Sequence, residues 1–326
     1  MHSAPPRGWC KRDPEGKREV DETSALPGNC PLEATGVYHI DFRPLADKEV
    51  QNDNELPRHG QRESTENVRM NAQVWDRISE SYFEEISTPF QAEVVNPLLD
   101  YLDGLPGREN LTVADLGCGI GNLLPFLAGR FKAVVAVDFS PKMLSAAQEN
   151  CAYDNVQFCR QSLTDLAVFQ GQFDVAVTVN SVLAPSLDVV DQILRGVAGT
   201  LKPAGILAGI FPSMESVLHE GGLILDWERQ RSENEQQALR RAQRKTKTSC
   251  YDFIAGLYTE GSDCQKFYYS FELRRRLQKA GFRGLQFGKV LYPWHKEDGE
   301  IRFSSEPRLW DWFVRATLSS GWSDRG

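Results

Sequence analysis

The most informative stretch of the sequence is Val113-Ala114-Asp115-Leu116-Gly117-Cys118-Gly119-Ile120-Gly121-Asn122. The apolar residues at its start predict the end of a strand, and a helix is predicted from Leu123 to Leu127. Glycines between a strand and a helix allow a sharp turn and let a ligand approach the backbone closely. A purely structural turn would also explain one or two of these glycines, so the chain around them has to distinguish the two interpretations.

Apolar runs and helical segments alternate downstream of this loop. The predicted strands are Leu111–Asp115, Ala133–Asp138, Val156–Cys159, Phe173–Val179 and Ile206–Phe211. Ser140 followed by Pro141 is typical of a helix N-terminus, and Leu187–Val197 carries one apolar helical face that ends before Lys202-Pro203. This alternation predicts an α/β fold with a doubly wound, mostly parallel sheet, that is, a Rossmann-like αβα sandwich.

The last third of the chain departs from this alternation. Residues from about Met214 to Lys266 form a long, partly helical insertion, which we expect to carry specificity. A helix is predicted over Glu272–Ala280, stopped by Gly281. Two strand-like runs, Leu285–Tyr292 and Trp312–Leu318, follow without a clear helix between them. They suit an antiparallel pair at a sheet edge, which gives seven strands with the last one antiparallel.

The N-terminal region has a different composition. Residues 1–68 hold seven prolines and three aromatic residues and show no sustained periodicity, so we expect a mostly disordered extension. A short strand over Gly36–Phe42 is the one exception that the pattern allows. Residues 69–320 are expected to form one domain that begins with two helices, the first carrying Trp75 and Tyr82 and the second Val94 to Leu102. Removing about 60 residues should therefore leave folding intact.

Composition narrows the classes of partner. The chain has 37 basic and 45 acidic residues and a formal net charge of −8, which disfavours nucleic acid and favours a small-molecule partner. The basic run from Arg240 to Lys247 lies in a helix-like polar stretch, which we interpret as a solvated helix face. Apolar residues make up 41% of the chain, enough for a substantial core.

The cysteines and the apolar runs bear on location. Seven scattered cysteines without a Cys-x-x-Cys pair argue against a disulfide framework and against a bound metal. A reducing compartment is the natural setting for them. There is no signal-like apolar segment near residue 1 and no run of about 18 apolar residues. We therefore expect a soluble cytoplasmic protein without a membrane span.

The chemistry of the glycine loop follows from its spacing and its charge. The third glycine comes two residues after the second rather than three, which is not the dinucleotide fingerprint. Asp115 precedes the loop, where it would repel a pyrophosphate and attract an ammonium group. Asp138 ends the next strand, in position to accept hydrogen bonds from a ribose diol. Its alternative role is to cap the following helix, for which Ser140 is better placed.

With these residues the sequence resembles the class I S-adenosylmethionine-dependent methyltransferase family, and the resemblance runs from about Asn71 to Leu318. The resemblance implies that S-adenosyl-L-methionine is the cofactor and S-adenosyl-L-homocysteine the product. It implies that Asp115 and the glycine loop face the methionine part of the cofactor, that Asp138 holds the ribose hydroxyls, and that Phe139 and Met143 border the cofactor. The loop residues concerned are Gly117, Cys118, Gly119 and Gly121.

Two further segments are similar to motifs of this family. The segment that begins at Val156 leads to Ser162 and Leu163, which by resemblance meet the adenine, although many relatives have an acid in place of Ser162. The fourth strand ends at Asn180, where relatives place a residue facing the methyl donor. Leu201–Gly205 resembles the turn before the fifth strand.

The expected reaction is methyl transfer to a small-molecule acceptor by in-line displacement, which depends largely on holding donor and acceptor together. No catalytic residue is assigned, although His219 and His295 are candidate bases, and each is equally interpreted as a surface histidine. Two roles are open for several aromatic side chains, which either line the acceptor pocket or pack in the core. These are Trp75, Tyr82, Tyr258, Tyr268, Tyr269, Tyr292 and Trp294.

Three alternatives stay open. A protein or nucleic-acid methyltransferase is disfavoured because Asn180-Ser181-Val182-Leu183, and no Asn/Asp-Pro-Pro-Tyr motif, follows the fourth strand. A non-catalytic cofactor-binding protein would be expected to have a damaged loop, and a nicotinamide dehydrogenase would have the other glycine spacing. The sequence identifies neither the methylated atom nor the oligomeric state.

Overall fold

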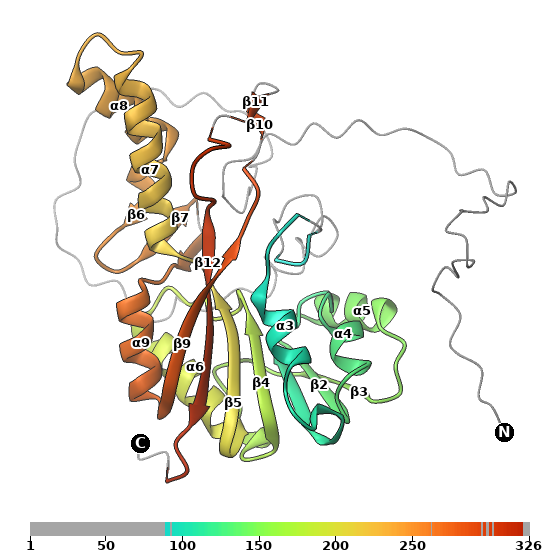
Figure 1. Ribbon diagram of the computed structural model, residues 1–326. Coiled ribbons are helices and arrows are strands. Elements are labelled where there is room, and N and C mark those ends of the chain that lie inside the picture. Colours follow the sequence, from blue (N-terminus) through green and yellow to red (C-terminus); the bar gives the residue numbers. More distant parts are fainter. Residues whose placement is uncertain are drawn as a thin grey trace, which may run out of the picture. The chain divides into compact units, whose positions relative to one another are not determined.

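The structure is a computed structural model that describes residues 89–91, 93–261, 263–294, 296–297, 300–301 and 303–321. Seven strands form its central sheet, in the order β3-β2-β1-β4-β5-β12-β9 (Figure 1). Strands β3, β2, β1, β4 and β5 run parallel, and β12 pairs antiparallel with both β5 and β9. The predicted fold, a mostly parallel seven-stranded sheet with an antiparallel last strand, is confirmed.

The strands agree closely with the apolar runs of the sequence. Their bounds are Thr112–Leu116 for β1, Ala133–Asp138 for β2, Val156–Arg160 for β3, Phe173–Val179 for β4, Leu201–Phe211 for β5, Phe282–Leu291 for β9 and Trp310–Leu318 for β12. Strand β5 begins earlier than predicted, because Leu201 already pairs with Phe173. The register shifts before Ile206 pairs with Val175, and Ala204 has a left-handed backbone (φ 62°). The predicted turn is thus an irregularity within β5.

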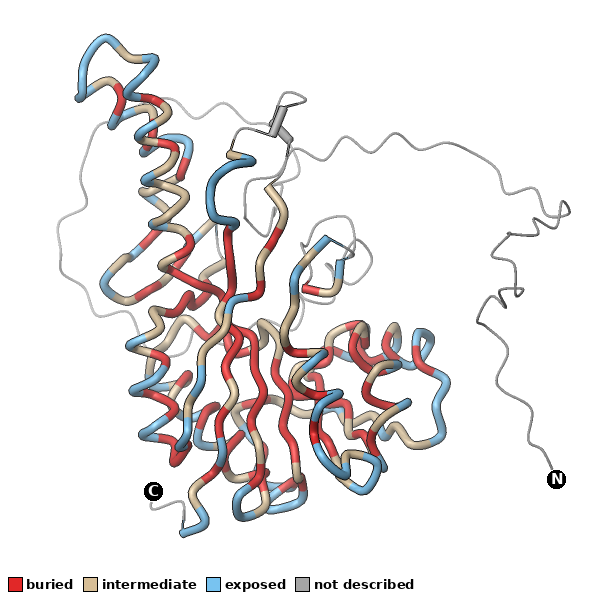
Figure 2. The backbone as a smooth tube through the Cα atoms, in the orientation of Figure 1, coloured by how far each residue is buried: buried red, intermediate tan, exposed pale blue. Residues whose placement is uncertain are grey.

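Helices cover both faces of the sheet. One face packs against α6 (Leu187–Thr200) and α9 (Ser270–Lys279). The other packs against α3 (Pro97–Asp103), α4 (Leu124–Ala128) and α5 (Pro141–Asn150). The central strands are buried from both sides, as Figure 2 shows.

Within these elements the predicted helix signals have clear structural roles. The face of α6 that meets the sheet carries Val190, Ile193, Leu194 and Val197, all buried as its spacing predicts. Ser140 caps α5, since its Oγ accepts a hydrogen bond from the backbone N of Met143 at 3.1 Å. In the part of the chain that the structure describes, three 3-10 turns lie in connections, at Arg108–Asn110, Ala167–Phe169 and Thr248–Cys250. None of the described helices is long and apolar enough to cross a membrane.

The insertion after β5 contains helices and a second sheet. Helices α7 (Met214–Arg229) and α8 (Glu235–Lys245) pack against each other. A three-stranded antiparallel sheet follows, formed by β6 (Tyr251–Asp252), β7 (Leu257–Glu260) and β8 (Asp263–Lys266). The sequence predicted a partly helical insertion but not this sheet. A further two-stranded hairpin, β10 (Lys296–Glu297) with β11 (Glu300–Ile301), lies between β9 and β12.

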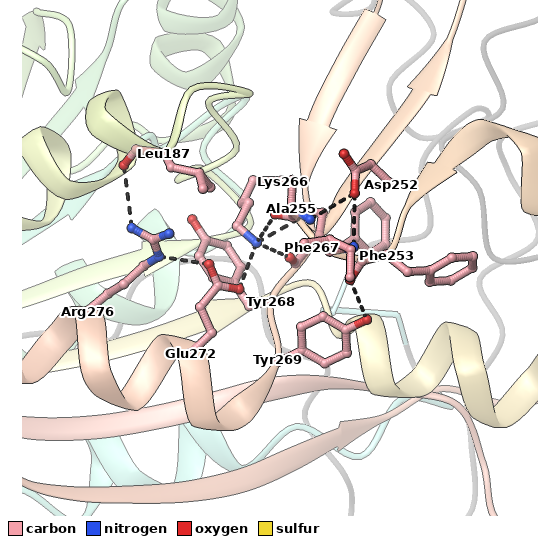
Figure 3. A network of polar contacts seen from close by, with 12 residues as sticks. Leu187, Asp252, Phe253, Ala255, Lys266, Phe267, Tyr268, Tyr269, Glu272 and Arg276 are labelled. Carbon is pink, nitrogen blue, oxygen red and sulfur yellow. Dashed lines mark hydrogen bonds and ion pairs between the residues drawn. The ribbon is translucent and has the colours of Figure 1, made fainter.

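A buried polar network joins the insertion to α9 and α6 (Figure 3). The Lys266 side chain is 0% exposed, and its Nζ donates to Ala255 O at 2.9 Å and Phe267 O at 2.7 Å. The same Nζ lies 2.8 Å from Glu272 Oε2 on α9. Glu272 also binds Arg276, which reaches Asp191 on α6. A buried charge is tolerated only with such partners, so this network fixes the insertion against α9.

Some predicted segments lie outside the described residues. These are the extension over residues 1–68, the short strand over Gly36–Phe42 and the first helix after Asn71. The second predicted helix is α3, which starts at Pro97 with Asn96 as its cap, rather than at Val94. Proline at the first helical position explains this later start, because it fits there and disfavours a helical residue before it.

Candidate functional site

The glycine loop leaves the end of β1 and folds over β2. The backbone N atoms of Gly117 and Cys118 both donate to Val137 O, at 2.7 and 3.0 Å. Gly117 has φ +82°, and a Cβ on it would lie 2.3 Å from the Cβ of Ser181. Ser181 Oγ in turn donates to Leu116 O at 2.8 Å. No other residue type fits at Gly117, because the loop packs directly against the segment after β4.

The other two glycines have different surroundings. Gly121 has φ +83°, and a Cβ there would lie 3.1 Å from atoms of Ala147 on α5. Gly119 has φ +54°, but a Cβ there would meet no atom within 4 Å. Gly117 and Gly121 are therefore required by packing inside the protein. Gly119 is the point of the loop whose backbone borders open space, which is what close approach of a ligand needs.

Asp138 ends β2 with its carboxylate directed at this loop. Its Oδ2 accepts from the backbone N of Gly119 at 3.0 Å, and its Oδ1 from the backbone N of Ser140 at 2.9 Å. The side chain is only 7% exposed. Two backbone donors fix the plane of the carboxylate, which has about four lone-pair positions and so can accept further bonds. This orientation suits recognition of a diol.

Asp115 is the fourth residue of β1 and is 2% exposed. Burial, and then the neighbouring charge of Asp138, raise the pKa of its carboxyl to about 7. No hydrogen bond between described residues involves this carboxylate, whereas Asp138 has two backbone donors. A buried acid next to another acid is a favourable position for a cation, since a positive ligand group would relieve both penalties. Asp115 and Asp138 thus differ in what they can bind.

Cys118 lies within the loop, and its side chain is buried. It is 9% exposed, and burial raises the pKa of its thiol well above the usual range, with the charges of Asp115 and Asp138 adding to the effect. A thiol held protonated is a poor nucleophile. The contribution of Cys118 to the site is therefore its backbone, which binds Val137 O.

The candidate residues that follow Asp138 and β3 differ in how deeply they are buried and in what they contact. Phe139 is half-buried, and Met143 is buried on the first turn of α5. The Ser162 hydroxyl lies 2.8 Å from Thr164 Oγ1 and accepts from Thr164 N at 3.2 Å, so it closes a local turn. Leu163 is 4% exposed and belongs to the core that packs on α6. Of this pair, Ser162 is the one with a polar side chain outside the core.

Asn180 follows β4 in a left-handed conformation (φ 46°). Its Nδ2 donates to Asp311 Oδ2 at 2.9 Å, and Tyr292 OH donates to the same oxygen at 2.7 Å. Asp311 is 4% exposed, and burial raises the pKa of its carboxyl to about 6, although its hydrogen bonds oppose this shift. The sequence prediction missed Asp311. The available signal was one acid within the apolar run Leu309–Phe313.

The remaining candidates are dispersed. His219 lies on α7, where its Nε2 is 3.1 Å from Pro307 O and its ring is 5.5 Å from that of Trp310. Tyr258 and Tyr268 are buried in two different hydrophobic clusters, which matches core packing rather than an acceptor wall. Trp294 packs on Phe303. Trp75, Tyr82 and His295 lie outside the described residues.

The comparisons with known proteins agree with this geometry. Residues 113–205 match the model of the methyltransferase domain family. A ubiquinone biosynthesis O-methyltransferase of Xanthomonas campestris pv. campestris is 36% identical over 117 residues, which cover 35% of this chain and 48% of that protein. A trans-aconitate 2-methyltransferase of Variovorax paradoxus is 32% identical over 123 residues, covering 36% and 45%. The chain thus spans about half the length of these curated relatives.

A solved structure supports the fold alone. A protein from the complex of the Haloferax volcanii Trm112 methyltransferase activator superposes with a TM-score of 0.52. The two chains are 14% identical, and the match covers 79% of this chain and 100% of the other. The likeness therefore extends beyond residues 113–205, to most of the sheet and its helices.

Proposed function

We propose that the chain is a class I S-adenosylmethionine-dependent methyltransferase that transfers the methyl group of this cofactor to a small-molecule acceptor. The observation that carries the proposal is the arrangement at the ends of β1 and β2. Asp115 offers a buried carboxylate for an ammonium group, Asp138 an oriented carboxylate for a diol, and Gly119 an uncovered backbone between them. S-adenosylmethionine carries these features in one molecule.

In this proposal the residues of the chain bind and orient. Asp115 pairs with the amino group of the methionine part, and Asp138 accepts hydrogen bonds from the ribose. Gly117, Cys118 and Gly121 hold the loop in place, while Phe139, Met143, Ser162 and Leu163 border the ribose and adenine. Asn180 lies towards the methyl group.

When bound, the cofactor supplies an electrophilic methyl group on a sulfonium. The acceptor provides the electron pair of the new bond, the pair of the broken carbon–sulfur bond stays on sulfur, and S-adenosylhomocysteine is released. In-line attack needs little from the protein beyond near-attack geometry. A small-molecule acceptor is supported by the acidic net charge of −8 and by the substrates named for the two bacterial relatives.

Calorimetric titration with S-adenosylmethionine and S-adenosylhomocysteine tests the cofactor site. We expect micromolar binding of both ligands. Asp138→Ala should weaken it by at least about tenfold, because two hydrogen bonds to a charged group are lost. Asp154→Ala, at an exposed acid in the turn before β3, is the matched control and should bind normally. A folded protein that binds NAD tightly, without competition from S-adenosylhomocysteine, would overturn the assignment.

A second assay tests the transfer itself. Protein that binds the cofactor is incubated with S-adenosylmethionine labelled in its methyl group and a panel of small hydroxyl and amine compounds. Label should appear in a small product and not in the protein or in added RNA. Transfer into protein or nucleic acid with none into the panel would contradict the proposed acceptor class while leaving the cofactor site intact.

A further inference from the structure

Three strand ends meet at a single buried carboxylate beside the proposed methyl-transfer site. Asp311 is the second residue of β12, Asn180 follows β4 and Tyr292 follows β9. Asn180 Nδ2 and Tyr292 OH both donate to Asp311 Oδ2, and the backbone N of Ser213 after β5 also bonds the carboxylate. These strand ends lie at the sheet edge where ligands bind in open α/β folds. The cluster therefore lies at the edge of the sheet that holds the proposed site, and of its residues only Asn180 has a role in the proposal above.

The cluster fixes how the Asn180 amide points. The backbone N of Asn180 donates to Ile210 O at 2.9 Å, and the left-handed backbone sets the direction of the side chain. Asp311 has to face the Nδ2 end of the amide, because an amide oxygen would be repelled by an ionised carboxylate. Oδ1 is therefore held on the opposite side, away from Asp311.

Asn180 Oδ1 is buried and has no hydrogen-bond donor among the described residues. A buried amide oxygen without a donor is unfavourable, so a ligand that brings a donor to it gains affinity. The neighbouring residue, Ser181, packs against Gly117 of the cofactor loop and bonds Leu116 O. The unpaired oxygen thus belongs to the residue that directly precedes this contact between the end of β4 and the cofactor loop.

We infer that Asp311 is a positioning residue, which orients the Asn180 carboxamide so that Oδ1 accepts a hydrogen bond from the N–H or O–H of the methyl acceptor. The acceptor class that follows is a protic nucleophile, an amine or a hydroxyl. This inference rests on the proposed function. An amide does not take up the acceptor's proton, so the proton passes to water as the new bond to the methyl carbon forms and the carbon–sulfur pair returns to sulfur.

Sinefungin provides a test that needs no identified acceptor. In this cofactor analogue an amine-bearing carbon replaces the methylated sulfur, so its ammonium group places N–H donors where methyl and acceptor meet. Titration of sinefungin and S-adenosylhomocysteine gives the ratio of their affinities for each variant. The wild-type protein should prefer sinefungin by about tenfold, the size of one charge-assisted hydrogen bond.

Three variants separate positioning from plain structural support. Asn180→Ala should lose the preference, because its affinity for sinefungin should fall by about tenfold more than its affinity for S-adenosylhomocysteine. Asp311→Asn should also lose most of it, because an amide partner no longer distinguishes the two ends of the Asn180 side chain. Tyr292→Phe removes a bond to the same Asp311 oxygen but keeps the charge, so it should retain the preference.

The outcomes are distinguishable. Equal losses in Tyr292→Phe and Asp311→Asn would show a structural role, and an unchanged ratio in Asn180→Ala would show that Oδ1 does not face the transferred group. Either result overturns the inference. A folded wild-type protein that binds neither ligand would instead contradict the proposed function. Melting temperatures of all variants identify any that fail to fold, and Asn180→Ser then replaces Asn180→Ala.

Discussion

Replacing Asp115 by asparagine should stabilise the ligand-free protein, and the gain should depend on pH. The native carboxyl has a pKa of about 7 against an ordinary value of 3.8, because it is buried beside Asp138. Between these two values the native state binds more protons than the unfolded state, so the free energy of unfolding falls as pH rises from about 4 to about 7. A difference of about three pH units corresponds to about 4 kcal/mol at most.

Asparagine has nearly the same shape and no charge to bury. The stability of Asp115→Asn relative to the wild-type protein should therefore rise by about 3 kcal/mol between pH 4.5 and pH 8. Urea unfolding followed by tryptophan fluorescence at pH 4.5, 6 and 8 measures this difference. Asp154→Asn, at an exposed acid, controls for the change in net charge.

If the difference between Asp115→Asn and the wild-type protein is the same at pH 4.5 and pH 8, burial of a charge is not its cause. If the variant also binds S-adenosylhomocysteine as tightly as the wild-type protein, Asp115 does not hold the amino group. Greater stability together with weaker binding would show that the carboxylate is retained for the ligand rather than for the fold.

Two substitutions elsewhere have effects that the structure predicts. Gly117→Ala should lower the free energy of unfolding by about 2 kcal/mol or more and abolish cofactor binding, because of its left-handed φ and the 2.3 Å contact with Ser181. Gly171→Ala, with φ +63° and no atom within 4 Å, measures the backbone strain alone by the same urea titration. Lys266→Met should cost about 3 kcal/mol by leaving Glu272 with a missing partner, while cofactor affinity in the folded variant stays unchanged.

The sequence predicts most accurately the strands that are buried on both faces. Ala133–Asp138 and Phe173–Val179 were predicted to the residue because both faces of these strands are covered, which produces continuous apolar runs. Strands β6, β7 and β8 were missed because they have only two to four residues and alternate weakly. Lys266 marked the end of a polar insertion in the sequence, and only the fold reveals that Glu272 allows it to be fully buried.

In the candidate site, too, features that depend on neighbouring residues were predicted, and contacts between residues far apart in the sequence were not. The roles expected for the glycine loop and Asp138 follow from local order along the chain, and the structure brings them together. Asp311 contacts Asn180 from 131 residues away, so no local pattern indicates that pair. The Ser162 hydroxyl likewise bonds Thr164. The sequence does not indicate whether this hydroxyl bonds a neighbouring residue or a ligand.

The buried acid also makes cofactor affinity depend on pH, in a direction opposite to that of the stability. An ammonium group binds the ionised form of Asp115, and with a pKa of about 7 this form rises about tenfold between pH 6 and pH 8. The affinity for S-adenosylhomocysteine should rise by about the same factor, equivalent to about 1.4 kcal/mol. Asp115→Asn should bind weakly at both pH values. A wild-type affinity that is constant from pH 6 to pH 8 would mean either that Asp115 is already ionised in the free protein or that it lies away from the amino group, and the stability profile of Asp115→Asn distinguishes these two cases.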